Sequence, residues 1–359
     1  MASIEELRKQ IDGIDSQLLE LLNKRASLVI EVGRIKRERN SDLHVPKREK
    51  EIIARLASEN KGPFPDESLK NVFREIFSAS LSLEQPLKIA YLGPRATFTH
   101  LACIQHFGYS PQYVPVNSIK EVFDEVERGL AEYGVVPVEN SIEGAVSYTL
   151  DMFMESELKI SAEIMLEVSE NLLNKTGRME DIKKIYSHPQ PIGQCRGWLE
   201  SNMRGVPLES VSSTARAAEI AAEDTSAAAI ASRLAAEIYG LKVVKERIED
   251  NANNYTRFLI ISKKSPSRTG ADKTSLLFSV KDKAGALFEM LKPFAKHGIN
   301  LTKIESRPSR KKAWEYHFFV DLEGHYEDEN VKAAIDELAK DCLFLKVLGA
   351  YPTVKGQTK

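Results

Sequence analysis

The sequence has little cysteine, no charge imbalance and no long apolar run. Its three cysteines, Cys103, Cys195 and Cys342, lie far apart, so we expect neither a disulfide scaffold nor a structural zinc site. The 50 basic and 52 acidic residues nearly cancel, which argues against a dedicated nucleic-acid binder. No apolar stretch could span a bilayer, and the first residues, MASIEELRKQ, contain no signal-peptide core. These absences predict a cytoplasmic protein with no membrane or nucleic-acid partner.

The chain is long and apolar enough for several domains. It has 359 residues, of which 42% are hydrophobic, and chains of this length usually form two or three domains. The hydrophobic pattern changes its period twice along the sequence. We therefore predict a first domain at 1–85, a second at 87–262, a linker at 263–273 and a third domain at 274–359.

The first segment has the pattern of a long amphipathic helix. Apolar residues recur alternately three and four positions apart, which forms a heptad seam. A helix from Ile4 to Arg39 would be about 54 Å long, too long to be buried within a domain of this size, so a partner should cover the seam. Two shorter helices are expected at 48–59 and 66–83. The seam consists of Ile4, Leu7, Ile11, Ile14, Leu18, Leu21, Leu28, Val32 and Ile35.

One seam position carries a cation. Arg25 stands where Ile, Val or Leu is expected, and Arg8 and Lys36 flank the seam. An unpaired guanidinium in a helix core is costly, so either an acidic side chain or a bound anionic ligand should meet it. Arg8 and Arg25 are 17 residues apart, about 25 Å along one helix. They can serve one small ligand only if a second, antiparallel copy supplies Arg8, which predicts a dimer with two mixed sites.

The runs LRKQIDGIDSQLLELLNKRASLVIEVGRIK and VPKREKEII resemble the all-helical chorismate mutases. The resemblance implies binding of chorismate, a dicarboxylate, and its pericyclic rearrangement to prephenate, which needs no nucleophile, acid or base. The protein has to hold both carboxylates in the reactive geometry and stabilise partial negative charge on the ether oxygen. Arginine suits the carboxylates because its guanidinium binds them bidentately. By resemblance Lys36 donates to the ether oxygen, and the chorismate-binding residues are Arg8, Arg25, Lys36, Arg48, Glu49, Ser80 and Glu84.

Two positions depart from the mutase pattern. Val45 stands where bacterial members often have Asp, and Glu84 stands where the second donor to the ether oxygen is often Gln. Ser80, one turn earlier on the same helix face, supports this alignment over Gln85. A carboxylate would repel the developing negative charge, so we expect Glu84 to act when protonated and mutase activity to favour mildly acidic pH.

From Leu87 onward, short apolar strands alternate with helices, which is typical of an α/β layer fold. Small hydroxyl and amide residues gather where these strands end, and helix N-termini at such junctions favour anions. Each of these residues could equally be an ordinary helix cap. Strands are expected at 88–92, 133–138, 184–188 and 256–262, helices at 118–130 and 214–223, and polar junctions at 93–102, 136–146, 186–195, 212–218 and 250–260.

This segment is similar to the prephenate dehydratases, and the triplet Thr256–Phe258 is its most specific match. The resemblance implies two α/β subdomains around a cleft, as in periplasmic binding proteins, and conversion of prephenate to phenylpyruvate with loss of water and carbon dioxide. By resemblance Thr256 gives the departing hydroxyl a hydrogen bond or proton, as a positioned donor. The prephenate-binding candidates are Thr97, Asn140, Ser141, His188, Gln190, Ser213, Thr214, Arg257 and Phe258.

Other residues of this segment have more than one interpretation. His188 could be an acid, but a histidine before proline could equally order its loop. Glu139 shares the strand end of Asn140, and Asp250 could orient the Thr256 loop. Ala96 stands where members of the family usually have glycine, so we expect the backbone there to avoid positive φ.

The last segment follows the order βαββαβ of the ferredoxin-like fold. Its runs GALFEML (285–291) and ESRPS (305–309) resemble the ACT domain, a ferredoxin-like module that binds amino acids at subunit interfaces. Without that resemblance, the second run would be interpreted as a polar edge strand. Given the two preceding segments, L-phenylalanine is the expected allosteric effector, acting by feedback inhibition. By resemblance its contacts are Gly285, Ala286, Leu287, Glu305, Ser306 and Arg307.

The predicted fold class is multidomain: an all-α mutase domain, an α/β dehydratase domain of two subdomains, and a ferredoxin-like α+β ACT domain. The predicted function is an enzyme with both activities in L-phenylalanine biosynthesis, assembled as a homodimer or larger homo-oligomer. No metal or organic cofactor is implied. One alternative is a dehydratase whose helical segment is a non-catalytic dimerisation or sensing arm. Another is a bilobed amino-acid-binding protein with a regulatory module and no enzymatic activity.

Overall fold

The computed structural model describes residues 3–38, 46–84, 87–280, 284–308 and 316–353. It divides into two compact units, Met1–Lys88 with Phe107–Gln112, and Ile89–His106 with Tyr113–Lys359. Within the described ranges, no helix is long and apolar enough to cross a membrane. Val45, one of the departures from the mutase pattern, and Gln85 lie outside the described residues.

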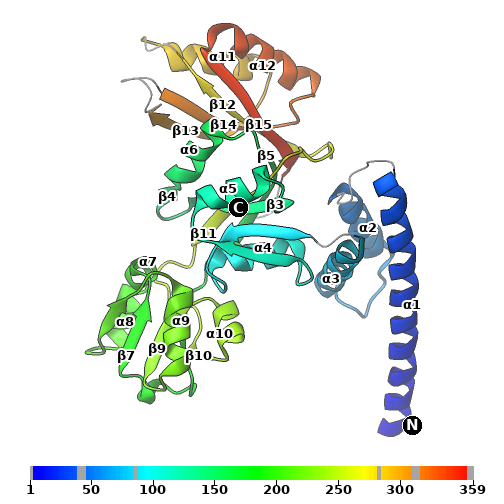
Figure 1. Cartoon of the computed structure of the whole chain (residues 1–359), viewed down its shortest axis with the longest axis vertical. Coiled ribbons are helices and arrows are strands. Elements are labelled where there is room, and N and C mark those ends of the chain that lie inside the picture. The colour runs from blue at the N-terminus through cyan, green and yellow to red at the C-terminus, as the bar shows by residue number, and fades with distance from the viewer. Residues whose placement is uncertain (1–2, 39–45, 85–86, 281–283, 309–315, 354–359) are drawn as a thin grey trace. The chain divides into compact units, whose positions relative to one another are not determined.

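The first unit is helical, as predicted. It contains α1 (Ile4–Glu38), α2 (Pro46–Glu59) and α3 (Asp66–Glu84) (Figure 1). Gly33 of α1 lies against α3, because a Cβ atom there would be only 2.9 Å from Cγ of Glu84. The nine apolar residues of the heptad seam are all exposed, and Ile4 at its start is 70% exposed, whereas Arg25 on the same seam is half-buried. An exposed apolar stripe of this length fits the predicted need for a partner.

The second unit begins with a mixed sheet in the strand order β2-β1-β3-β11-β5, with the short strand β4 paired to β3. Its core contains side chains of α5 and α6 together with residues of β3, β5 and β11. The strands are β1 (Lys88–Leu92), β2 (Gln112–Val116), β3 (Tyr133–Asn140), β4 (Gly144–Ala145), β5 (Lys159–Glu167) and β11 (Tyr255–Ser262), and the helices are α4 (Phe98–Phe107), α5 (Ile119–Glu127) and α6 (Ser147–Glu155).

A second mixed sheet has the order β10-β6-β9-β7-β8. The chain leaves the first sheet after β5 and returns to it in β11, so two segments cross between the sheets (Figure 1). This gives the two α/β subdomains that were predicted. The elements are β6 (Asn171–Asn174), the short 3-10 helix η1 (Met179–Asp181), β7 (Lys184–Ser187), α7 (Pro189–Gln194), α8 (Arg196–Asn202), β8 (Leu208–Ser210), α9 (Thr214–Glu223), β9 (Ala227–Ala231), α10 (Arg233–Tyr239) and β10 (Lys242–Lys245).

The last segment is an antiparallel sheet in the order β13-β14-β12-β15, with α11 and α12 sharing a core with it. The element order βαββαβ confirms the ferredoxin-like prediction. This sheet packs closely on the dehydratase segment, because a Cβ atom at Gly349 would overlap the carbonyl oxygen of Ile160. The elements are β12 (Asp272–Ser279), α11 (Ala286–Lys296), β13 (Leu301–Pro308), β14 (Tyr316–Glu323), α12 (Glu329–Asp341) and β15 (Phe344–Pro352).

Candidate active sites

The cation on the heptad seam meets the facing helix. The Arg25 guanidinium donates a hydrogen bond to the Ser80 hydroxyl and lies over the ring of Phe77, 5.5 Å from its centroid. Burial lowers the pKa of Arg25, and the nearby carboxylates of Glu49 and Glu84 partly oppose that shift. Its hydrogen bond goes to a hydroxyl, and two acidic side chains act on it through space.

Lys36 of α1 and Glu84 of α3 face each other, and Glu84 lies one helical turn along α3 from Ser80. The Lys36 ammonium and the Glu84 carboxylate are 3.5 Å apart, and the Glu84 side chain is almost fully buried. Gly33 makes this approach possible because it has no side chain to displace Glu84. The cluster thus combines two cations with a hydroxyl and a carboxylate in a half-buried position.

Two other predicted chorismate ligands are exposed. Arg8 is exposed near the start of α1, about 25 Å along the helix from Arg25. Arg48 is exposed and pairs with Glu51 at 3.5 Å. One chain therefore brings together Arg25, Lys36, Ser80 and Glu84, with Glu49 near enough to act on Arg25, and leaves Arg8 apart.

The second site is centred on paired strands β3 and β11, where Asn140 lies opposite Thr256. The Asn140 amide donates to the Thr256 hydroxyl at 2.9 Å and to the Asn254 side-chain carbonyl at 2.9 Å. The Asn140 carbonyl accepts from the backbone N–H groups of Ile142 and Glu143. These bonds fix the amide orientation and leave the Thr256 hydroxyl free to donate its own proton.

Ser141 binds the same loop from the other side of the strand end. Its hydroxyl donates to the Asn253 carbonyl at 3.0 Å and accepts from the Tyr255 N–H at 2.9 Å. Two predicted residues, Asn140 and Ser141, thus hold the segment that leads into Thr256.

Two residues that the sequence analysis missed extend this network to the second subdomain. Asn254 is fully buried, and its amide donates to the Gln194 side-chain carbonyl at 3.0 Å. The Gln194 amide nitrogen is buried and has no hydrogen-bond partner among the described residues. It is a donor that a bound anion could use. A glutamine inside a short helix carries no sequence signal for this role, although Gln194 lies in one of the expected polar junctions.

Several predicted residues act locally as helix caps. Thr97 accepts from the His100 N–H at the start of α4, His188 accepts from the Gln190 N–H through Nδ1, and Ser213 caps α9. His188 thus orders its loop in this structure, and its role at the substrate stays a prediction. Thr214 and Phe258 are buried.

Asp250, considered as a residue that could orient the Thr256 loop, lies at the start of α8. Its carboxylate accepts from the backbone N–H groups of Gly197 and Trp198 at 2.8 and 3.0 Å. These are the free donors at the start of α8, so Asp250 caps that helix.

The expectation for Ala96 was wrong. Its φ is +69°, the left-handed conformation in which glycine is usual. Ala96 is fully buried, its N–H donates to Nδ1 of His100, and its carbonyl accepts from the Ser232 hydroxyl. These contacts outweigh the cost of a left-handed alanine, about 1–2 kcal/mol.

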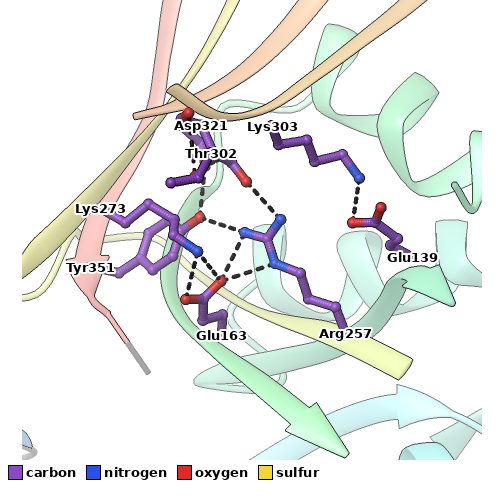
Figure 2. A network of polar contacts seen from close by, with 9 residues as sticks. Glu139, Glu163, Arg257, Lys273, Thr302, Lys303, Asp321 and Tyr351 are labelled. Carbon is purple, nitrogen blue, oxygen red and sulfur yellow. Dashed lines mark hydrogen bonds and ion pairs between the residues drawn. The ribbon is translucent and has the colours of Figure 1, made fainter. Parts of the chain in front are cut away.

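Arg257 was a candidate for prephenate binding, and the structure places it in a different network. Neighbouring residues of a strand point to opposite faces, so Arg257 points away from the face that carries the Thr256 hydroxyl. It is 8% exposed and donates to Glu163 at 2.9 Å, Asp321 at 2.6 Å and Tyr351 at 3.0 Å (Figure 2). Burial acts to lower the pKa of Arg257, but Tyr351, Asp321 and Glu163 more than reverse this and raise it.

Profiles of three families match successive segments of the chain. They are Chorismate mutase type II at residues 7–85, Prephenate dehydratase at 89–266 and the ACT domain at 274–340. The chain is 53% identical over 356 residues to the Bifunctional chorismate mutase/prephenate dehydratase of Aquifex aeolicus (strain VF5), and the match covers 98% of each protein. The chain belongs to this bifunctional family.

Other relatives agree. The bifunctional chorismate mutase/prephenate dehydratase of Pseudomonas aeruginosa is 44% identical, with 97% of both proteins covered. A solved structure titled as prephenate dehydratase from Arthrobacter aurescens in complex with L-Phe has a TM-score of 0.70 and 35% identity, covering 76% of this chain and 92% of that one. The chain has chorismate mutase and prephenate dehydratase activities, which confirms the predicted function and excludes both the non-catalytic arm and the non-enzymatic binder.

The ACT residues of this bifunctional enzyme fall on two elements. Gly285 precedes α11 with φ +79°, Ala286 is buried and Leu287 is partly exposed. Glu305, Ser306 and Arg307 lie on the edge strand β13, where Arg307 pairs with Asp151 of α6 at 3.3 Å. Arg307 therefore binds the dehydratase segment in this structure, and position 309 of the ESRPS run lies outside the described residues. In the part of the chain that the structure describes, no group of acidic, His or Cys side chains could hold a metal ion.

Proposed function

We propose that Arg25, Lys36, Ser80 and Glu84 form most of the mutase site and that Arg8 of a second copy completes it. The bond from Arg25 to Ser80 supports this, because it places the cation on the face that α3 covers. Arg25 and Arg8 bind the two carboxylates, Lys36 donates to the ether oxygen, and Glu84 assists when it carries a proton. Arg48 and Glu49 complete the set that the family resemblance assigns to chorismate.

The enzyme is then a homodimer in which two copies pair along the α1 seam. The seam leucines and isoleucines are exposed in a single chain, and an antiparallel copy would cover them while delivering Arg8. A subunit-mixing experiment tests this. Arg8→Ala and Arg25→Ala copies should each be inactive as mutases, but a mixed dimer holds one site with both arginines and should regain activity. Failure of mixing to restore turnover, with subunit exchange verified, would exclude a shared site.

The dehydratase site is centred on Thr256, with Asn140 and Ser141 holding its loop. Thr256 donates to the departing hydroxyl of prephenate, and the amide bond from Asn140 fixes the direction of that hydroxyl donor. The caps Thr97, His188 and Ser213, with Gln190 and Thr214 in the first turns of their helices, lie at helix starts that suit the substrate carboxylates. The Gln194 amide adds a further donor, which supports placing the substrate between the two subdomains.

The ACT domain binds L-phenylalanine and inhibits the dehydratase by feedback, with Gly285 to Leu287 and Glu305 to Arg307 as the effector residues. Support comes from the ACT match and from the related dehydratase solved in complex with L-Phe. Inhibition requires two states of the enzyme that differ in their affinity for the effector. Calorimetry with the full chain should detect binding at millimolar L-phenylalanine or tighter, together with slower prephenate turnover. Absence of both would exclude this effector.

A further inference from the structure

At the dehydratase site, two neighbouring residue pairs join strands β3 and β11. Asn140 pairs with Thr256, and the next pair along the strands is Glu139 with Arg257. Because side chains alternate between the faces of a sheet, the Glu139–Arg257 pair projects from the face opposite the Thr256 hydroxyl. Any force on this second pair acts directly on the backbone that carries the first.

A matching pair faces it from the ACT domain. Lys303 of β13 and Asp321 of β14 are register partners in the ACT sheet. The Lys303 ammonium binds Glu139 at 2.6 Å, and Asp321 binds Arg257 at 2.6 Å (Figure 2). Each acidic residue on one sheet thus meets a basic residue on the other. We call these four residues, Glu139, Arg257, Lys303 and Asp321, the strand-pair contact.

Further groups hold the Arg257–Asp321 half of this contact. Glu163 accepts from Arg257 and from the Lys273 ammonium, at 2.9 Å in each case. The Ser275 hydroxyl donates to Asp321. The arginine and aspartate are both more than nine-tenths buried, so water cannot easily replace their partners. A buried charge network of this kind tolerates few alternative arrangements.

We propose that the strand-pair contact positions the dehydratase site, so that the ACT sheet sets the alignment of Asn140 with Thr256. Glu139, Arg257, Lys303 and Asp321 are then positioning residues, which act on the substrate only through the neighbouring pair. Glu305 and Arg307, two proposed effector residues, lie on the same strand as Lys303 and share its half-buried face. A shift of β13 on effector binding would therefore reach Glu139 through Lys303. This inference rests on the proposed roles of Asn140 and Thr256.

The chain offers a matched pair of lysines for the test. The Lys303 side chain is 12% exposed and binds Glu139, whereas the Lys346 side chain is 10% exposed and binds Glu157 at 3.0 Å. Both join the ACT domain to the dehydratase segment, but Glu157 lies outside β3 and β11. Lys→Met keeps the length of the side chain and removes its charge, and Glu139 is 39% exposed, so the variant leaves no fully buried charge and should fold.

The experiment measures kcat and KM for prephenate, and chorismate turnover, on the full-length Lys303→Met and Lys346→Met enzymes. We expect Lys303→Met to lower the dehydratase kcat about tenfold or more, because small misplacements of reacting groups have effects of this size, with KM changed less and mutase turnover unchanged. Lys346→Met should stay within about twofold of the parent enzyme. The exchanged pair Lys303→Glu with Glu139→Lys should restore kcat.

Equal effects of the two methionine variants would overturn the proposal, since the contact would then only dock the domains. The proposal would also be wrong if the enzyme with Lys303→Glu and Glu139→Lys folds but does not recover kcat. Prephenate turnover by a Thr256→Val enzyme distinguishes a failure of this proposal from a failure of the proposed dehydratase site. If Thr256→Val retains dehydratase turnover, the proposed site is wrong. If Thr256→Val is inactive and Lys303→Met has the parent kcat, only the positioning role is wrong.

Discussion

Glu170 directly precedes β6, where the chain has just crossed from the first sheet to the second. Its side chain is 1% exposed, and one of its carboxyl oxygens has no hydrogen-bond partner among the described residues. Burial, with a smaller contribution from Glu249, raises the pKa of Glu170 from an ordinary 4.5 to about 8. The group therefore keeps its proton in the folded enzyme at neutral pH.

The sign of the effect on stability follows from proton counts. Between pH 4.5 and 8 the folded state holds a proton on Glu170 that the unfolded chain has lost, so its contribution to stability is full at low pH and is lost as pH rises. The loss is about 1.4 kcal/mol per pH unit, which amounts to about 3 kcal/mol at pH 7. Glu170→Gln keeps the shape and stays neutral, so this variant should be more stable at pH 7 by roughly that amount and equal to the parent near pH 4.5.

Trp198 provides a local probe for this measurement. It packs on the cluster that contains Ile248, whose N–H binds the Glu170 backbone carbonyl. The chain has two tryptophans, so a Trp314→Phe background leaves Trp198 as the only one. Urea unfolding followed by Trp198 fluorescence at pH 5, 6, 7 and 8 gives the difference in stability between the parent and the Glu170→Gln enzyme. A difference that stays constant with pH, or a glutamine variant less stable at pH 7, would refute the reasoning.

Three further outcomes concern the mutase cluster and the ACT interface. Glu84→Gln should flatten the pH profile of chorismate turnover between pH 5 and 8, and a parent profile that is already flat would contradict the role given to Glu84. Gly33→Ala should lower mutase turnover by about tenfold, because its methyl group would lie 2.9 Å from Cγ of Glu84. Gly13→Ala on the same helix serves as the control, because its methyl group would meet nothing within 4 Å. Gly349→Ala should destabilise the ACT interface by about 1–3 kcal/mol, because its Cβ would overlap the Ile160 carbonyl. The melting temperature of the enzyme should therefore fall. An unchanged melting temperature would show that β15 has room to move.

Local chemistry predicted much of the fold. The alanine-rich pattern at 214–223 gives α9 its observed bounds, and Gly298, with φ +65°, follows the end of α11 as a helix-terminating glycine should. The change from a period of about 3.6 to short alternating strands near Leu87 also matches the start of β1 at Lys88.

The candidate sites were predictable only where resemblance or strand position carried the information. Arg257 was assigned to the substrate by resemblance, yet neighbouring residues of a strand point to opposite faces, and its partner Asp321 is 64 residues away in sequence. Asn254 and Gln194 join the network through contacts of similarly long range. The left-handed Ala96 depends on buried bonds with His100 and Ser232, which no local pattern reveals.

We expect two separate sets of residues to perform the two reactions. The most direct measurement is turnover of chorismate and of prephenate, assayed separately, by full-length Arg25→Ala and Thr256→Val enzymes. We expect Arg25→Ala to lose mutase turnover and keep dehydratase turnover, and Thr256→Val to show the reverse. Dehydratase turnover retained by Thr256→Val, or mutase turnover retained by Arg25→Ala, would contradict the account.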